Sequence, residues 1–397
     1  MAIEGELIID LVLDKPSNRI TIQSTRPVYA CQMLHGKSVS ESLNLLPLLF
    51  NICGVAQACA GVRACEQALD LKVSKKTEKL RDVLVKLETL REHLWRIILE
   101  WPRFIQKVTQ TAQDNTGIVE MLLIQRDYQK ALCANSQHRS VLDLGGVEVH
   151  SDQAQLKAVL KRFANLLKQH VFTITASEWL TLKKQKDLQH WAASKTSIAA
   201  QLIQQIIEDN WYNAGACQSV TLPALDLIQL DQAMQDVQYV RQPQWQGQCC
   251  ETSSLTRAQS PLLMALKKDH GNGLLVRLVA RLTETAQLFQ ELTDLELENE
   301  KSRISDETAL QTAITEKKGI GQAAAARGLL VHRVSINNNL IEYYQILAPT
   351  EWNFHPQGVV AQALASLQGD PQTIEKKARL LINSIDPCVA YKLQITG

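Results

Sequence analysis

Long stretches of this sequence repeat apolar residues with the period of an α-helix. Between residues 74 and 111, and again between 274 and 298, leucine, isoleucine and valine recur every three or four positions among charged residues. With 17 Gly and 11 Pro among 397 residues, the chain has few turn residues to interrupt such helices. We therefore expect a mainly α fold with a helical bundle at its core. Further helical patterns cover residues 40–71, 118–133, 152–170, 176–192, 195–210, 358–367 and 371–385.

Two β-hairpins are predicted, one near each end of the chain. Residues 6–13 and 20–24 alternate apolar and polar side chains on either side of a short polar segment. Residues 329–336 and 340–347 are joined by Asn337-Asn338-Asn339, and asparagine tolerates the left-handed conformation that a tight turn requires. The expected fold class is therefore α+β, mainly α with small β-hairpins.

The charges of the chain are balanced, with 42 Lys and Arg against 41 Asp and Glu. Such a chain has no overall field that would attract nucleic acid or an acidic membrane surface. The sequence has no run of about 18 apolar residues, and its first residues lack the basic and apolar regions of a signal peptide. We expect a soluble, cytoplasmic protein that binds neither nucleic acid nor a membrane.

Nine cysteines in a reducing compartment favour metal or redox chemistry over disulfides. No two of them have CxxC spacing, which disfavours zinc ribbons and ferredoxin-type clusters. Cys53, Cys59 and Cys65 share one predicted helix, but a spacing of six residues turns a helix by about 240°, so their thiols point in three directions. We interpret Cys59 and Cys65 as small buried residues, whereas Cys53 precedes Gly54, which permits a close backbone approach.

The other cysteines give weaker signals. Cys388 follows Pro387, which ends the helix predicted before it. Cys249 and Cys250 lie in residues 239–261, a segment rich in Gln, Ser, Thr and Pro whose lack of periodicity predicts a loop or mobile insert. We interpret this vicinal pair as exposed and without function. No partner spacing is found for Cys31, Cys133 and Cys217.

Short motifs near both ends of the chain point to a family. They are Glu4–Leu7, Leu34–Lys37, Leu49–Ala56, Ala60–Ala68, Ala326–His332, Pro349–Asn353 and Asp386–Cys388. In this order they resemble the large subunit of nickel-iron hydrogenases, and the resemblance covers about residues 1–70 and 320–397. It implies a large-subunit-like fold with a helical bundle core. The middle of the chain is not placed by these motifs.

The family's metal ligands are only half present. In such subunits four cysteines hold nickel and an iron that carries carbon monoxide and cyanide. By the resemblance, Cys53 and Cys388 match the pair that binds nickel terminally, whereas Ala56 and Tyr391 stand where the bridging pair would be. Two thiolates cannot reproduce a tetrathiolate site. We therefore expect no hydrogen activation, no enzymatic activity and no bound nickel.

Residues that match the pocket of the diatomic ligands are retained. Arg327 matches the family's arginine beside the cyanides, and Pro349 and Thr350 match residues beside the other diatomic ligand. A metal-bound cyanide is an anionic acceptor that a guanidinium or hydroxyl satisfies in a dry pocket. The alternatives are that Arg327 is a solvated residue at a helix end and that Thr350 is an N-cap before Glu351.

This combination resembles accessory proteins of the HupK/HoxV type, which belong to hydrogenase maturation systems. The resemblance implies a scaffold that holds or assembles an iron-cyanide-carbonyl fragment through Cys53 and Cys388 and delivers it to a hydrogenase large subunit precursor. Implied partners also include a small maturation chaperone and the iron-loading maturation complex. The alternative is a metal-free structural or interaction protein. Whether Cys31 or Cys59 supplies a further ligand stays open.

The resemblance also predicts the domain organisation. Because motifs from both ends must meet in one site, we expect a single domain over residues 1–397. Within it, residues 1–72 contain the first hairpin and the Cys53 helix, and residues 73–300 form the helical bundle with the loop at 239–261. Residues 320–397 contain the second hairpin and the Asp-Pro-Cys segment.

Overall fold

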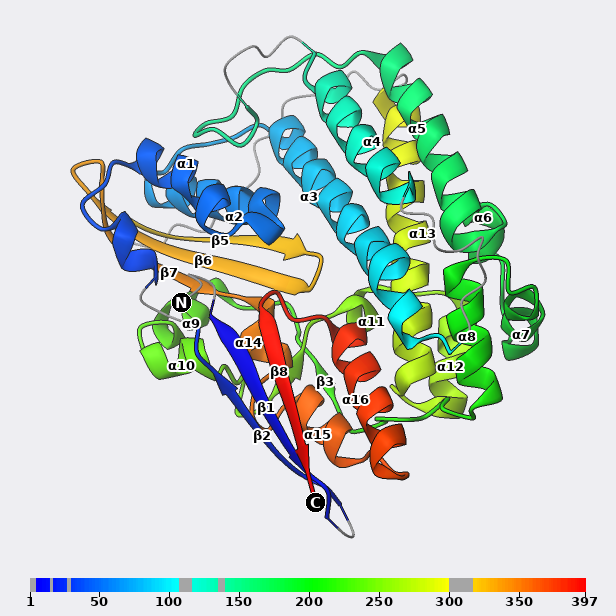
Figure 1. Cartoon of the computed structure of the whole chain (residues 1–397). Coiled ribbons are helices and arrows are strands. Elements are labelled where there is room, and N and C mark those ends of the chain that lie inside the picture. The colour runs from blue at the N-terminus through cyan, green and yellow to red at the C-terminus, as the bar shows by residue number, and fades with distance from the viewer. Residues whose placement is uncertain (1–4, 15–16, 27–29, 107–115, 135–139, 300–316) are drawn as a thin grey trace.

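The computed structural model of the chain describes residues 5–14, 17–26, 30–106, 116–134, 140–299 and 317–397 (Figure 1). Three features named above lie partly outside these residues. They are Glu4 of the first motif, residues 15–16 between the strands of the first hairpin, and the end of the helical pattern from residue 107 onward. The predicted fold class is confirmed within the described residues, since helices predominate and the sheets are small.

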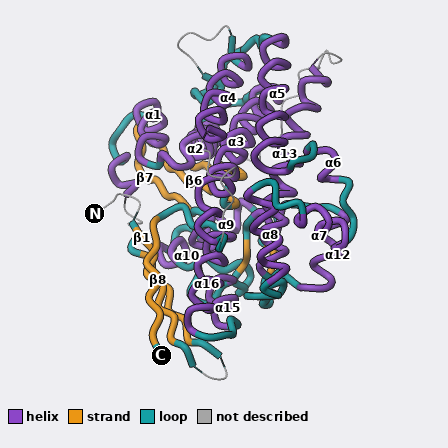
Figure 2. Tube along the Cα trace, turned by 45° about the vertical axis from the view of Figure 1, so that its right-hand side comes forward, coloured by secondary structure: helices purple, strands orange, loops and turns teal. Residues whose placement is uncertain are grey.

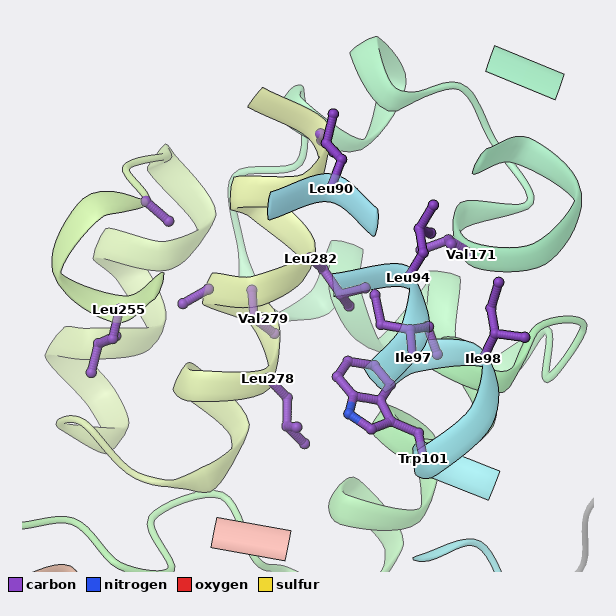
Figure 3. Packing of buried hydrophobic residues seen from close by; sticks show 14 of the residues in the cluster. Leu90, Leu94, Ile97, Ile98, Trp101, Val171, Leu255, Leu278, Val279 and Leu282 are labelled. Atoms are coloured by element: carbon purple, nitrogen blue, oxygen red, sulfur yellow. The ribbon is translucent and has the colours of Figure 1, made fainter. Parts of the chain in front are cut away.

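A helical bundle forms the part of the molecule that carries most of the core. It is built by α3 (Lys75–Trp95), α4 (Thr116–Leu132), α5 (Gln153–Leu167), α8 (Ile198–Glu208) and α13 (Leu274–Asn299) (Figure 1). Apolar side chains from α3 and the turns after it face those of α13 in Figure 3, including Leu94, Ile97, Trp101, Leu278 and Leu282. The amphipathic periods thus fold as predicted, because each helix buries its apolar stripe against its neighbours.

Further short helices complete the helical part of the chain. They are η1 (Ala30–Leu34), η3 (Arg96–Glu100), η4 (Trp101–Phe104), η6 (Lys168–Phe172), α6 (Ala176–Leu180), α7 (Gln185–Ala193), α9 (Leu227–Ala233), α10 (Val237–Arg241), α12 (Pro261–His270), α15 (Val359–Ala365) and α16 (Pro371–Ile385). The pattern over residues 176–192 predicted one helix, but the structure has two, α6 and α7. The reason is local: the chain leaves α6 at Thr181, and Asp187 closes the start of α7 by accepting from the backbone N–H groups of Lys183 and Lys184.

The helix predicted over residues 40–71 is also broken. The chain forms α1 (Val39–Leu49), leaves the helical conformation at Phe50, and continues as η2 (Asn51–Cys53) and α2 (Gly54–Ala68) at an angle of 99° to α1. Gly54 stands at this bend, where a Cβ atom would lie 3.2 Å from the carbonyl oxygen of Pro47. The bend places Cys53 at the N-terminal end of α2.

Helix α2 packs directly on the backbone of a three-stranded antiparallel sheet. The sheet has the order β5 (Lys318–Ala325), β6 (Gly328–Asn337) and β7 (Leu340–Leu347). Two glycines of β5 permit the contact, because a Cβ at Gly319 or Gly321 would fall 2.0 Å from a carbonyl oxygen of α2. The hairpin β6–β7 was predicted, and its turn has positive φ at Asn338 and Asn339. Strand β5 was not predicted.

A second small sheet joins the two ends of the chain. Its order is β2 (Arg19–Ser24), β1 (Glu6–Val12) and β8 (Ala390–Thr396), and β8 runs parallel to β1 with Leu7 opposite Tyr391. The hairpin β1–β2 is confirmed, whereas β8 was not predicted. Figure 2 shows β1 and β8 on the side of the molecule away from α5 and α13. This pairing places the residues just before β8 next to those just before β1 and just after β2.

The loop predicted at residues 239–261 is only partly confirmed, because irregular stretches alternate there with short regular elements. This segment contains β4 (Cys250–Glu251), which pairs with β3 (Val220–Thr221), and α11 (Ser254–Arg257), and much of it is buried. Polar side chains fix it: Asn353 accepts from the backbone N–H of Thr252 at 2.9 Å and donates to the carbonyl oxygen of Thr252 at 2.7 Å. Periodicity does not detect a segment held in this way.

Among the described residues, no single helix is long and apolar enough to cross a membrane. The bent pair formed by Val39–Leu49 and Asn51–Ala68 passes the same test by length and composition.

Candidate functional site

The structure brings Cys53 and Cys388 together from opposite ends of the chain. Cys53 is at the N-terminal end of α2, and Cys388 lies in the connection from α16 to β8; both are half-buried. Burial, followed by the nearby charges of Cys388 and Glu88, raises the pKa of the Cys53 thiol to about 12. The two sulfur atoms are thus within electrostatic reach of each other. Arg26 and Arg327 are each close enough to both thiols to interact with them electrostatically.

Cys388 is surrounded by hydrogen-bond donors. The hydroxyl of Thr350 donates to Cys388 Sγ at 2.9 Å and accepts from the backbone N–H of Cys388 at 3.2 Å. Arg26 Nη1 donates to the same sulfur at 3.6 Å and pairs with Glu351 at 3.4 Å. Thr350 lies in α14 (Pro349–Asn353), whose N-cap is Ala348. The alternative that Thr350 is an N-cap is therefore wrong.

Cys53 lies where a buried carboxylate fixes the start of α2. Glu88 Oε1 accepts from the backbone N–H of Val55 at 2.9 Å, and its Oε2 accepts from that of Ala56 at 3.0 Å. These are N–H groups that a helix start leaves without partners. Burial raises the pKa of Glu88 to about 7. Gln57, one turn further along α2, donates from Nε2 to Cys53 Sγ at 3.5 Å.

Arg327 is buried at the turn between β5 and β6, with a relative exposure of 2%. The alternative of a solvated arginine is therefore wrong. Its Nη1 lies 2.8 Å from Glu92 Oε2, and its Nε lies 3.5 Å from Asp386 Oδ1. Neither contact has hydrogen-bond geometry, so among the described residues the N–H groups on these two nitrogens have charged neighbours but no hydrogen-bond acceptor.

Asp386, two residues before Cys388, lies close to three arginines. Its carboxylate lies 2.7 Å from Arg96 Nη2, 3.6 Å from Arg281 Nη2 and 3.5 Å from Arg327 Nε. Burial acts to raise the pKa of Asp386, but the charges of these arginines together lower it to about 2. The backbone of Asp386 is left-handed, with φ of 71°, and this turn at the end of α16 points the chain toward Cys388.

Two cavities border the site. One has a volume of about 340 Å³, and its lining includes Cys388, Asp386, Arg96 and Ile52. The other has a volume of about 270 Å³, and its lining includes Arg26, Thr350 and Cys31. Cys388 and its hydrogen-bond donor Thr350 therefore each border a cavity.

The remaining cysteines are placed apart from this pair or buried. Burial raises the pKa of the Cys31, Cys59 and Cys65 thiols to about 12 each. The interpretation of Cys249 and Cys250 as exposed is wrong, because the segment that holds them is folded: Cys250 is 2% exposed, and Cys249 is half-buried with its Sγ 3.2 Å from Nδ1 of His355. Within the described ranges, no three or more His, Cys, Asp or Glu side chains are grouped so that they could hold a metal ion.

Several residues around the two thiols were not predicted. Arg26, Glu88, Glu92 and Asp386 reach the site from separate parts of the chain, and their pairing depends on the fold. Gln57 carries a signal that could have been used. It is a single amide in an otherwise small and apolar stretch of α2, and a buried amide requires partners.

Comparison with known proteins identifies the family. A family model described as nickel-dependent hydrogenase matches residues 182–392, more than half of the chain. The chain belongs to this family. It is 28% identical over 399 residues to the hydrogenase expression/formation protein HoxV of Cupriavidus necator, covering 96% of this chain and 94% of the relative. To the expression/formation protein HupK of Azotobacter vinelandii it is 26% identical over 364 residues, covering 92% and 90%.

These matches confirm the resemblance to the HupK/HoxV type, whose members are named for hydrogenase expression and formation. They also cover the middle of the chain, which the motifs did not place. Among solved structures, the nickel-iron-selenium hydrogenase of Desulfovibrio vulgaris Hildenborough matches with a TM-score of 0.65 at 16% identity, covering 95% of this chain and 94% of that chain. The likeness confirms the predicted large-subunit-like fold.

Proposed function

We propose that this protein acts in hydrogenase maturation as a scaffold. Its cargo is an iron that carries cyanide and carbon monoxide, which it holds or helps to assemble and then passes to a hydrogenase large subunit precursor. The observation that carries the proposal is the meeting of Cys53 and Cys388 beside the buried guanidinium of Arg327. The full-length similarity to hydrogenase expression/formation proteins supports it.

The two sulfur ligands suit a cargo that must be released. Thiolate is a soft ligand that fits an iron of this kind. Because the affinity of a site for its metal rises with the number of protein ligands, two protein sulfurs hold the fragment less firmly than four would. The cyanide and carbonyl groups would complete the iron's coordination, and no nickel is expected.

The unfilled donors of Arg327 fit the anionic ligands of the cargo. Two nitrogens of Arg327 lie beside carboxylates without hydrogen-bond geometry, and a cyanide nitrogen would accept hydrogen bonds from them. Pro349 would form an apolar wall at the start of α14. The hydroxyl hydrogen of Thr350 is directed to Cys388 Sγ, so Thr350 would act on the sulfur ligand and, after rotation of its hydroxyl, on the diatomic ligand.

The proposed partners follow from the cargo. An iron-loading maturation complex and a small maturation chaperone would supply the fragment, and the large subunit precursor would receive it. Cys388 borders the 340 Å³ cavity together with charged side chains of both signs, Arg96 and Asp386 among them, and this cavity would give the cargo its route.

Infrared spectroscopy tests the proposal. Protein purified anaerobically from cells with a complete maturation system should show metal-bound cyanide and carbonyl bands. The bands should vanish in Cys53→Ser and Cys388→Ser and weaken severely in Arg327→Gln. Cys65→Ser is the matched control, because this cysteine lies on α2 but is buried away from the pair, and it should keep the bands.

Two outcomes would contradict the proposal. Wild-type protein without iron and without such bands would favour the metal-free interaction protein instead. Hydrogen uptake by the isolated protein would show a catalytic subunit.

A further inference from the structure

Three buried side chains form a line that ends at the sulfur of Cys53. Gln57 of α2 donates from Nε2 to Cys53 Sγ at 3.5 Å, and its Oε1 lies 2.8 Å from Nε2 of His332 in β6. On the far side of the imidazole, Nδ1 of His332 lies 2.7 Å from the hydroxyl of Tyr344 in β7. All three side chains are buried, and His332 is 0% exposed.

The protonation states of the line are fixed by burial. Burial raises the pKa of Tyr344 well above its ordinary value, so its hydroxyl keeps its proton. Burial, and then the charge of Arg26, lowers the pKa of His332 to about 3, so the imidazole is neutral and carries a single N–H. Each member therefore has a definite number of hydrogens to donate.

This count fixes the direction of every hydrogen bond. Among the described residues, the Tyr344 hydroxyl has its hydrogen bond with His332 Nδ1, so the tyrosine donates its proton to that nitrogen. The single imidazole hydrogen then stands on Nε2 and is donated to Gln57 Oε1. The amide nitrogen of Gln57 is left to face Cys53. In the reverse direction, the tyrosine proton would have no acceptor among the described residues.

Local packing holds the end of the line in place. The hydroxyl of Tyr344 sits against Gly61 of α2, where a Cβ atom would lie 2.9 Å from the hydroxyl oxygen. A larger residue at position 61 would push the hydroxyl away from His332. The line thus spans α2, β6 and β7, and α2 is also the helix that packs on the backbone of β5 at its two glycines.

We propose that Tyr344 and His332 are positioning residues that turn the donor side of Gln57 toward Cys53. Cys388 likewise receives donors, from Thr350 and Arg26, so both sulfurs of the site are hydrogen-bonded by donors. A thiolate that accepts such bonds gives less electron density to a bound iron, which favours release of the cargo. This inference rests on the proposed function, since it concerns the iron held by Cys53.

The carbonyl stretch of the bound fragment tests the line. Loss of the Gln57 donor makes the sulfur a stronger donor to the iron, which strengthens back-donation to carbon monoxide. Gln57→Leu should therefore move the carbonyl band to lower wavenumber, and Tyr344→Phe should move it in the same direction by less. Tyr343→Phe changes an exposed tyrosine next to Tyr344 on β7; it is the matched control and should leave the band in place. Bands that keep their position in both line variants would overturn the inference.

A second measurement needs no iron. Nitrogen-15 spectra of histidine-labelled, iron-free protein should show His332 as the Nε2–H tautomer, with its signals assigned by their absence in His332→Gln. An Nδ1–H tautomer or a charged ring would overturn the line even where the wild type carries iron. Wild-type protein without iron bands would instead overturn the proposed function, while the tautomer still decides the direction of the line.

Discussion

The two ends of α2 carry buried polar clusters of opposite kinds. Near its C-terminal end, Arg81 donates five hydrogen bonds: two to Glu66 at 2.6 and 2.7 Å, one to Glu78, and two to the carbonyl oxygens of Val141 and Asp143. Both Arg81 and Glu66 have fully buried side chains. Near its N-terminal end, Arg327 is equally enclosed, yet two of its nitrogens have no hydrogen-bond acceptor among the described residues.

The two clusters differ in how completely their buried guanidinium is hydrogen-bonded within the described residues. When every donor of a buried guanidinium is satisfied, the cluster holds its segments in one arrangement. Donors left unfilled in a buried site lower stability unless something else satisfies them. We therefore expect variants at the two ends of this helix to behave differently.

The largest effect on folding is expected at the satisfied end. Glu66→Ala leaves the Arg81 charge buried without its main partner, which costs about 3–5 kcal/mol of the free energy of unfolding. Urea unfolding of the iron-free protein measures this loss. The control is Glu78→Ala, which removes the partly exposed partner of the same arginine and should cost about 1 kcal/mol or less. Equal losses in the two variants would contradict the distinction.

Acid should lower the stability of the hydrogen-bonded line formed by Gln57, His332 and Tyr344. The pKa of His332 is about 3 in the folded protein against an ordinary 6.5. Between these two values the unfolded chain binds a proton on this histidine and the folded chain does not. The corresponding stability is fully present above pH 6.5 and falls by about 1.4 kcal/mol per pH unit as the pH drops toward 3.

His332→Gln removes this dependence. Urea unfolding between pH 7 and pH 4.5 should therefore show the wild type losing stability relative to the variant as the pH falls. Parallel curves for the two proteins would contradict a buried neutral imidazole.

The sequence predicts the long helices and both hairpins because their patterns are local. It does not predict β5, because the small residues of this strand show no alternation and their role is to let α2 pack on its backbone. It does not predict β8 either, because this strand forms by pairing with β1 from the other end of the chain. The break at Phe50 likewise depends on packing around Gly54. The expectation of one domain over residues 1–397 stays a prediction.

The site divides in the same way. Cys53, Cys388, Arg327, Pro349 and Thr350 were named from motifs, and the fold places the two cysteines, Arg327 and Thr350 around one point. Their role toward a metal stays a prediction. Arg26 and Asp386 were not predicted as site residues, because the partners of a charged side chain become clear only when distant segments are folded together.

The smallest effect is expected at Thr350, whose hydroxyl bridges the sulfur and the backbone N–H of Cys388. Thr350→Val keeps the shape but leaves that N–H without its acceptor, so it should lower the free energy of unfolding by about 1 kcal/mol. Thr350→Ser should restore it. Thr89→Val is the control, because the Thr89 hydroxyl only donates to the carbonyl oxygen of Val85 within α3, and its loss should change little. An equal loss of unfolding free energy in Thr350→Val and Thr89→Val would contradict a specific contribution of the hydroxyl bridge to Cys388. A cost at Thr350 alone, with a shifted carbonyl band in the iron-loaded protein, would tie this hydroxyl to the sulfur ligand.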